Sequence, residues 1–141
     1  MCKKIRFEQP VYSFNIDSNR HVSNLIYIEW MEIARIKLLE AVGLPLGELE
    51  NRGFAPVLRS TCIDYKAPLF LGDHLVIELW ISKLTRIAAT MEIRFFRNGN
   101  ELAASGFQKG LFVSLETERP YRLSDEEKGL FEPFLLESSE D

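Results

Sequence analysis

The chain has 141 residues, a length that fits one domain with its own core, and 46% of its residues are hydrophobic. The net charge of −4 and the scattered lysines and arginines argue against a surface that binds nucleic acid or anionic membranes. Two cysteines, Cys2 and Cys62, make no disulfide framework, and the N-terminus lacks the apolar run of a signal peptide. From the two cysteines we expect reduced thiols and a cytoplasmic protein. No stretch approaches roughly 18 consecutive apolar residues, so we expect no segment that spans a membrane.

The first third of the chain predicts a strand followed by a long helix. Residues 3–16 carry the apolar and aromatic side chains typical of a strand. A helix over about 23–42 follows, because Ser23 or Asn24 can cap its start and Gly43 can end it. Its polar stripe is narrow, so we expect the rest of the domain to wrap around this helix.

After a loop that ends near residue 54, the sequence indicates strands almost to the end. Four segments of strand length are rich in β-branched and aromatic residues: 55–65, 74–84, 87–97 and 101–116. Asn98-Gly99 is a strong signal for a hairpin turn between the last two. Ser124 and Glu127 form a capping box that begins a short helix to about 136.

This order of elements predicts an α+β domain in which one curved antiparallel sheet wraps around a long central helix, the hot-dog architecture. Residues 1–141 then form a single domain, and we expect the acidic tail over 137–141 to be frayed. In the last strand, Gly106 and Gly110 indicate bulges or points where another backbone comes close.

The segment DSNRHVSN, residues 17–24, places polar side chains directly before the apolar helix. Asp17, Asn19 and His21 alternate along it, and the helix that follows offers free N–H groups and the positive end of its dipole. Acyl transfer needs such an arrangement: a carboxylate that attacks or activates water, and donors for the developing oxyanion. Considered alone, Asp17 could instead be an aspartate that caps a turn or a helix, and His21 could be a structural histidine.

Signatures of other enzyme classes are absent from the sequence. It contains no nucleophile elbow, phosphate-binding loop or dinucleotide fingerprint. His21 and His74, the two histidines, have no paired ligand spacing, so we expect neither a metal nor another cofactor. Cys62 could act as a nucleophile with His21, although its mid-strand position disfavours this. Asp73 and His74 fall at a turn and suit a structural role.

The stretch DSNRHVSNLIYIEWMEIAR resembles the D-x-x-x-H-V-x-N-x-x-Y-(x)n-E-x-x-R signature of hot-dog acyl-CoA thioesterases, the group that contains 4-hydroxybenzoyl-CoA and long-chain acyl-CoA thioesterases. It is also similar to the D-x-N-x-H-V-N-N-x-x-Y-I-x-W stretch of plant-type acyl-ACP thioesterases. Further on, IDYKAPLFLGD is similar to the family's I-D-Y-x-x-P-x-x-x-G-D segment. The similarity covers roughly residues 8–115.

The resemblance implies a thioesterase that hydrolyses acyl-CoA or acyl-ACP thioesters to free acid and thiol. It implies that Asp17 is the nucleophile or the general base, and that Asn19 and His21 position the substrate or handle protons. Backbone N–H groups near Asn24 would hold the thioester carbonyl. The predicted substrate-binding residues are Asn24, Tyr27, Arg59 and Tyr65.

Two residues depart from the family's pattern. Arg20 stands where many bacterial members have glycine, and Ser23 stands where the first asparagine of a pair is usual. Arg20 could form a salt bridge with Asp17 that favours the ionised carboxylate, or it could narrow the acyl pocket.

The resemblance also implies a site between two subunits, hence a homodimer or a tetramer of two dimers. A single curved sheet leaves strand edges to be paired, which agrees with this expectation. Two alternatives stay open: a non-catalytic domain that binds or senses acyl thioesters, and a hot-dog hydratase or dehydratase that pairs His21 with an acid across the interface. The sequence does not choose between CoA and a carrier protein, or among fatty, β-keto and aromatic acyl groups.

Overall fold

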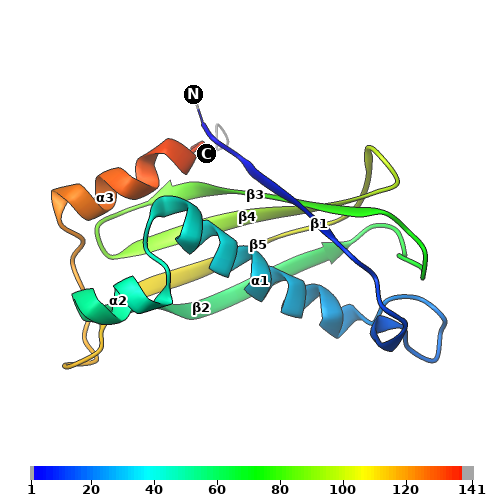
Figure 1. Cartoon of the computed structure of the whole chain (residues 1–141), viewed down its shortest axis with the longest axis horizontal. Helices are drawn as coiled ribbons and strands as arrows, with labels where there is room; N and C mark the ends of the chain where they lie inside the picture. Colours follow the sequence, from blue (N-terminus) through cyan, green and yellow to red (C-terminus); the bar gives the residue numbers. More distant parts are fainter. Residues whose placement is uncertain (1, 138–141) are drawn as a thin grey trace.

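A five-stranded antiparallel sheet curves around the long helix α1 (Asn24–Val42) in this computed structural model, which describes residues 2–137 (Figure 1). The strands are β1 (Ile5–Gln9), β2 (Phe54–Tyr65), β3 (Leu75–Leu84), β4 (Ala88–Arg97) and β5 (Glu101–Ser114), and they follow the order β1-β3-β4-β5-β2 across the sheet. The predicted hot-dog architecture is confirmed. Of the tail predicted to be frayed, all but Glu137 lies outside the described residues.

The predicted bounds of α1 are confirmed by its two caps. The side chain of Ser23 accepts a hydrogen bond from the backbone N–H of Leu25 at 3.3 Å. Gly43 ends the helix with a φ of +90°, a left-handed conformation that glycine adopts without strain. The start of α1 is thereby fixed next to the polar segment that precedes it.

One side of α1 packs on the sheet, as Figure 1 shows. The buried residues of the helix are Tyr27, Trp30, Met31, Ala34, Leu38, Leu39 and Val42. Leu25, Ile33 and Ile36, however, are exposed. The prediction that the domain wraps around the whole helix is therefore wrong for a single chain, because one sheet can cover only one side of a helix.

Two segments differ from the prediction. The expected strand over 3–16 is shorter, since β1 ends at Gln9 before Pro10 and the chain then forms the 3₁₀ turn η1 (Ser13–Asn15). The expected loop before residue 54 contains helix α2 (Leu46–Arg52), which Gly53 ends in a left-handed conformation.

Ion pairs attach α2 to the end of the chain. Arg52 donates to Glu48 at 2.7 Å within α2 and to the buried Glu127 at 3.2 Å. Glu127 lies in helix α3 (Asp125–Phe131), whose predicted capping box with Ser124 is confirmed. A second 3₁₀ turn, η2 (Glu132–Phe134), follows directly.

The two glycines of β5 have different surroundings. A Cβ atom at Gly106 would lie 2.4 Å from the carbonyl oxygen of Cys62 and 3.3 Å from Cε of Met31. At Gly110 the nearest atom would be the carbonyl oxygen of Val57, at 3.6 Å. The expected close approach of another backbone is found at Gly106, beside Cys62. The expected bulge is found opposite Gly110, where the register of β2 is irregular between Leu58 and Ser60.

This contrast gives a matched pair of variants. We expect Gly106→Ala to lower the free energy of unfolding by about 2 kcal/mol or more, because its Cβ meets backbone that cannot move aside. Gly110→Ala should leave stability unchanged or raise it by about 0.5 kcal/mol, since it only restricts the unfolded chain. Urea denaturation of both variants checks this, and equal effects would contradict it.

Candidate active site

The polar segment before α1 folds into a tight turn. Ile16 and Val22 form an isolated antiparallel bridge, and the N–H of Asp17 donates to the carbonyl of His21 at 3.0 Å. The side chain of Asp17 accepts a hydrogen bond from the backbone N–H of Asn19 at 2.8 Å through Oδ1. One carboxylate oxygen is thus held by the turn, while Oδ2 has no hydrogen-bond partner among residues 2–137.

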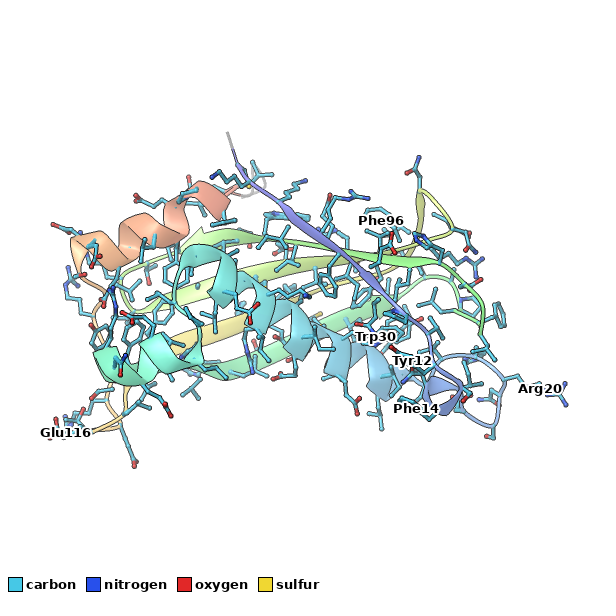
Figure 2. The ribbon with its side chains drawn as sticks, in the orientation of Figure 1. Tyr12, Phe14, Arg20, Trp30, Phe96 and Glu116 are labelled. Carbon is cyan, nitrogen blue, oxygen red and sulfur yellow. The ribbon has the colours of Figure 1, made fainter. Side chains whose placement is uncertain are left out.

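Arg20 points away from the protein at the tip of this turn (Figure 2). Its backbone φ of +71° is left-handed, a conformation that is uncommon for residues other than glycine. The glycine expected at this position from the family's pattern would adopt it without strain. The described residues form no ion pair between Arg20 and Asp17. The predicted salt bridge is therefore not formed, because the backbone at Arg20 turns its side chain outward.

The two sequence motifs meet at one backbone hydrogen bond. The N–H of Val22, in the first motif, donates to the carbonyl of Leu69, in the second, at 2.8 Å. Asp73 fixes the turn of the second motif by accepting from the N–H of Phe70 at 2.8 Å and from Asn98 at 3.0 Å. Asp73 therefore has the structural role that the sequence suggested.

The first N–H groups of α1 differ in their partners. Leu25 donates to the Ser23 side chain, and Ile26 donates to the Ser23 carbonyl at 3.0 Å. The N–H of Asn24 has no acceptor among the described residues. Because it stands at the positive end of the helix dipole, it can stabilise a negatively charged oxygen.

A depression of about 210 Å³ lies beside this helix start. Four predicted site residues line it, namely His21, Asn24, Tyr27 and Tyr65. Lys66, Ala67 and Pro68 form the rest of its wall with Val22. Lys66 and Ala67 were not predicted, since they occupy variable positions of the second motif, where no pattern marks them.

The two tyrosines of the depression pack against each other. Their ring centres lie 5.0 Å apart in an edge-to-face arrangement, and the Tyr65 hydroxyl donates to the carbonyl of Asn24 at 2.8 Å. Burial, and next the neighbouring Tyr65, raise the pKa of Tyr27 to about 12. Burial also raises the pKa of Tyr65. Both hydroxyls are therefore protonated at neutral pH and can donate hydrogen bonds.

The other predicted residues lie outside this depression. Asp17 and Asn19 belong to the turn that leads into it. Arg59 lies at the irregular point of β2, six residues before Tyr65, which is about 20 Å along a strand. It lines a separate depression with Lys83 and Lys109, so one chain does not bring Arg59 to the helix start.

Among residues 2–137, no group of three or more His, Cys, Asp or Glu side chains could hold a metal ion. No helix of this part of the chain is long and apolar enough to cross a membrane.

A family model described as the Thioesterase-like superfamily matches residues 14–135. The chain is 24% identical over 94 residues to a putative acyl-CoA thioesterase, YneP, of Bacillus subtilis, covering 67% of this chain and 68% of that protein. It is 26% identical over 132 residues to the chloroplastic acyl-acyl carrier protein thioesterase ATL3 of Arabidopsis thaliana, covering 91% and 67%.

Solved structures share the fold. The protein SAV2348 of Staphylococcus aureus, solved in complex with CoA, superposes with a TM-score of 0.86 at 20% identity, over 95% of this chain and 85% of that one.

The raised pKa of Tyr27 predicts a loss of stability in alkali. Unfolded tyrosine loses its proton near pH 10, but folded Tyr27 does so only near pH 12, so the free energy of unfolding should fall as pH rises between these values. Tyr27→Phe should reduce this fall by an amount on the order of 1 kcal/mol per pH unit. Urea denaturation from pH 9 to 12 measures it. Tyr12→Phe, which changes an exposed tyrosine, is the control. If the free energy of unfolding falls equally steeply with pH in both variants, Tyr27 is not the group that causes the fall.

Proposed function

We propose that this chain, which belongs to the thioesterase-like superfamily and hydrolyses acyl thioesters, does so with Asp17 as its acting carboxylate. The observation that carries the proposal is that Asn24, whose N–H has no acceptor among residues 2–137, lines the depression at the start of α1, directly after the turn that holds Asp17. A donor and a carboxylate in neighbouring positions are the two parts that acyl transfer requires.

The thioester carbonyl oxygen would accept the N–H of Asn24. As the carbonyl carbon becomes tetrahedral, its oxygen gains negative charge, and this N–H and the helix dipole stabilise that charge more than they stabilise the ground state. Removal of one such donor in other enzymes costs roughly 10²–10³-fold in turnover. The helix start would thus supply electrostatic catalysis without a metal ion.

Asp17 would supply the second part. Its Oδ1 is held by Asn19, which leaves Oδ2 to attack the carbonyl carbon or to take a proton from a water that attacks. If Oδ2 attacks, the carbon–sulfur bond breaks, the thiolate takes a proton, and water then hydrolyses the acyl–aspartyl anhydride to release the acid and the free carboxylate. If Asp17 instead takes a proton from water, the hydroxide adds to the carbonyl carbon, the carbon–sulfur bond breaks, and the proton passes to the leaving thiolate. Cys62 does not line the depression, so it is not the nucleophile in this proposal.

The remaining predicted residues would orient the substrate. His21 lines the depression, and its Nδ1 lies 3.4 Å from the carbonyl of Val22, which leaves Nε2 as the nitrogen free to exchange protons. Tyr27 would donate a hydrogen bond to the substrate, and Tyr65, whose hydroxyl already donates to the Asn24 carbonyl, would pack against the pantetheine arm. Asn19 would act indirectly, by fixing the Asp17 side chain.

We also propose that the protein is a homodimer. Within residues 2–137, β2 is an edge strand that pairs with β5 alone, and its residues Val57 and Leu58 are exposed. The exposed side of α1 adds Leu25, Ile33 and Ile36. A second copy paired through β2 would cover apolar surface and satisfy the strand edge. Arg59, in the middle of β2, would then face the partner.

The carrier of the acyl group is CoA or a carrier protein, and the relatives include both kinds by name. We infer a cytoplasmic location from the two free thiols, Cys2 and Cys62, because disulfides are rare in a reducing compartment.

The variant Asp17→Asn tests the role of the carboxylate. The amide can still accept the Asn19 hydrogen bond, so the melting temperature should change little. Because it is neither nucleophilic nor basic, kcat should fall by roughly 10²–10⁴-fold, with substrate affinity within a few-fold of the parent. Thiol release from acyl-CoA gives kcat.

Asp125→Asn is the matched control for this variant. The side chain of Asp125 is 91% exposed at the start of α3, and we expect unchanged turnover. A well-folded Asp17→Asn protein with near-parental kcat would end the catalytic assignment of Asp17.

The dimer is tested by Ile36→Glu, which puts a charge on the exposed side of α1. We expect the parent to scatter light as twice 16.3 kDa and the variant as a single chain with its circular dichroism retained. Leu136→Glu changes an exposed apolar residue elsewhere and should leave the dimer intact. A parent of 16.3 kDa at micromolar concentration would contradict the proposal.

A further inference from the structure

The carbonyl group of Asn24 is bound by a side chain from a distant part of the chain. The hydroxyl of Tyr65, the last residue of β2, donates to it at 2.8 Å, although 41 positions separate the two residues. In an α-helix this carbonyl also accepts the N–H of Ile28, and its second lone pair is left for Tyr65. Tyr65 therefore joins the first turn of α1 to the end of a strand.

The strand end that carries Tyr65 is itself held in the sheet. The N–H groups of the next two residues, Lys66 and Ala67, both donate to the carbonyl of Ala103 in β5, at 2.8 and 3.0 Å. The Tyr65 ring packs edge-to-face on the buried ring of Tyr27. The backbone and the ring thus fix the place from which the hydroxyl donates.

The first turn of α1 has few other contacts that would fix it. The side chains of Asn24 and Leu25 are exposed, and the Leu25 N–H reaches the Ser23 side chain only at 3.3 Å. On the preceding side, the Ser23 N–H donates to the carbonyl of Asn15 at 3.0 Å. The N–H of Asn24 therefore lies between two fixed points: a backbone hydrogen bond before it and the Tyr65 hydroxyl after it.

The position of this N–H determines how well it can stabilise an oxyanion. A donor acts only when it lies at hydrogen-bond distance from the place that the oxygen takes in the transition state. A misplacement of about 1 Å can cost up to roughly 10²-fold in rate. The hydrogen bond from Tyr65 is exposed, so water would satisfy the Asn24 carbonyl if the hydroxyl were removed. Water would not, however, join the helix to the strand.

We propose that the Tyr65 hydroxyl is a positioning group for thioester hydrolysis, because it fixes the first turn of α1 and with it the N–H of Asn24. The inference rests on the oxyanion role proposed above for that N–H. The hydroxyl acts through Asn24 and does not touch the reacting atoms. It is thus separate from the Tyr65 ring, which would pack against the substrate.

The variant Tyr65→Phe tests this role, since it removes the hydroxyl and keeps the ring. We expect kcat to fall roughly tenfold with KM within about twofold of the parent, because the Asn24 N–H stabilises the transition state more than the bound substrate. Thiol release is measured with the substrate that the parent hydrolyses fastest among butanoyl-, tetradecanoyl- and benzoyl-CoA. An unchanged kcat would overturn the inference, and a raised KM beside it would show that the hydroxyl binds the substrate instead.

Tyr121→Phe is the matched control, because it also removes a tyrosine hydroxyl that donates a hydrogen bond. The Tyr121 hydroxyl donates to Glu127 at 2.9 Å, and Tyr121 does not line the depression at the start of α1. We expect a lower melting temperature and an unchanged kcat. An equal fall of kcat in both variants would mean that turnover follows stability alone, and it would overturn the positioning role.

Amide hydrogen exchange gives a readout that does not depend on turnover. The N–H of Ile28 shares the Asn24 carbonyl with Tyr65, so its exchange should become faster by roughly threefold or more in Tyr65→Phe and stay unchanged in Tyr121→Phe. If the parent hydrolyses no thioester, the proposed function fails, and faster exchange still shows that the hydroxyl holds the helix start. Unchanged exchange of Ile28 in Tyr65→Phe would overturn the inference.

Discussion

The hydrogen bond from the Val22 N–H to the Leu69 carbonyl is the interaction on which the candidate site depends. It joins two motifs that are 47 positions apart in the sequence, and it fixes the chain immediately before α1. Ser23 can then cap the helix, and Asn24, whose N–H has no acceptor among the described residues, lines the depression. The turn that carries Asp17 is fixed to the same point by the Ile16–Val22 bridge and by the hydrogen bond from the Ser23 N–H to the Asn15 carbonyl at 3.0 Å, so the second motif, the turn and the helix start are held together.

The sequence predicted most of the fold because the local signals agreed with one another. The caps of α1, the β-branched and aromatic content of the four long strands and the Asn98-Gly99 turn all specify the same sheet around one helix. The close approach at Gly106 was visible for the same reason, since a glycine within a strand has few other uses. Helix α2 was missed because its signal is short, and an ion pair between Arg52 and Glu127, distant in sequence, stabilises it.

The site was less predictable because its residues come together through packing. Four of the predicted residues line one depression, but Arg59 lies far from it along β2. A sequence motif gives the spacing of residues along the chain and not their distance in space. The exposed side of α1 was also mistaken for a buried one, because a sequence gives apolar residues the same pattern whether they are covered by their own chain or, as we propose here, by a second copy.

The start of α1 connects the candidate site to the proposed interface. Tyr65, which donates its hydroxyl to the Asn24 carbonyl at 2.8 Å, is the last residue of β2, and β2 is the edge strand through which we propose that two copies pair. A second chain that fixed β2 would therefore also fix Tyr65 and, through it, the first turn of α1. One hydrogen bond would thus join the proposed interface to the helix end at which the thioester carbonyl would be held.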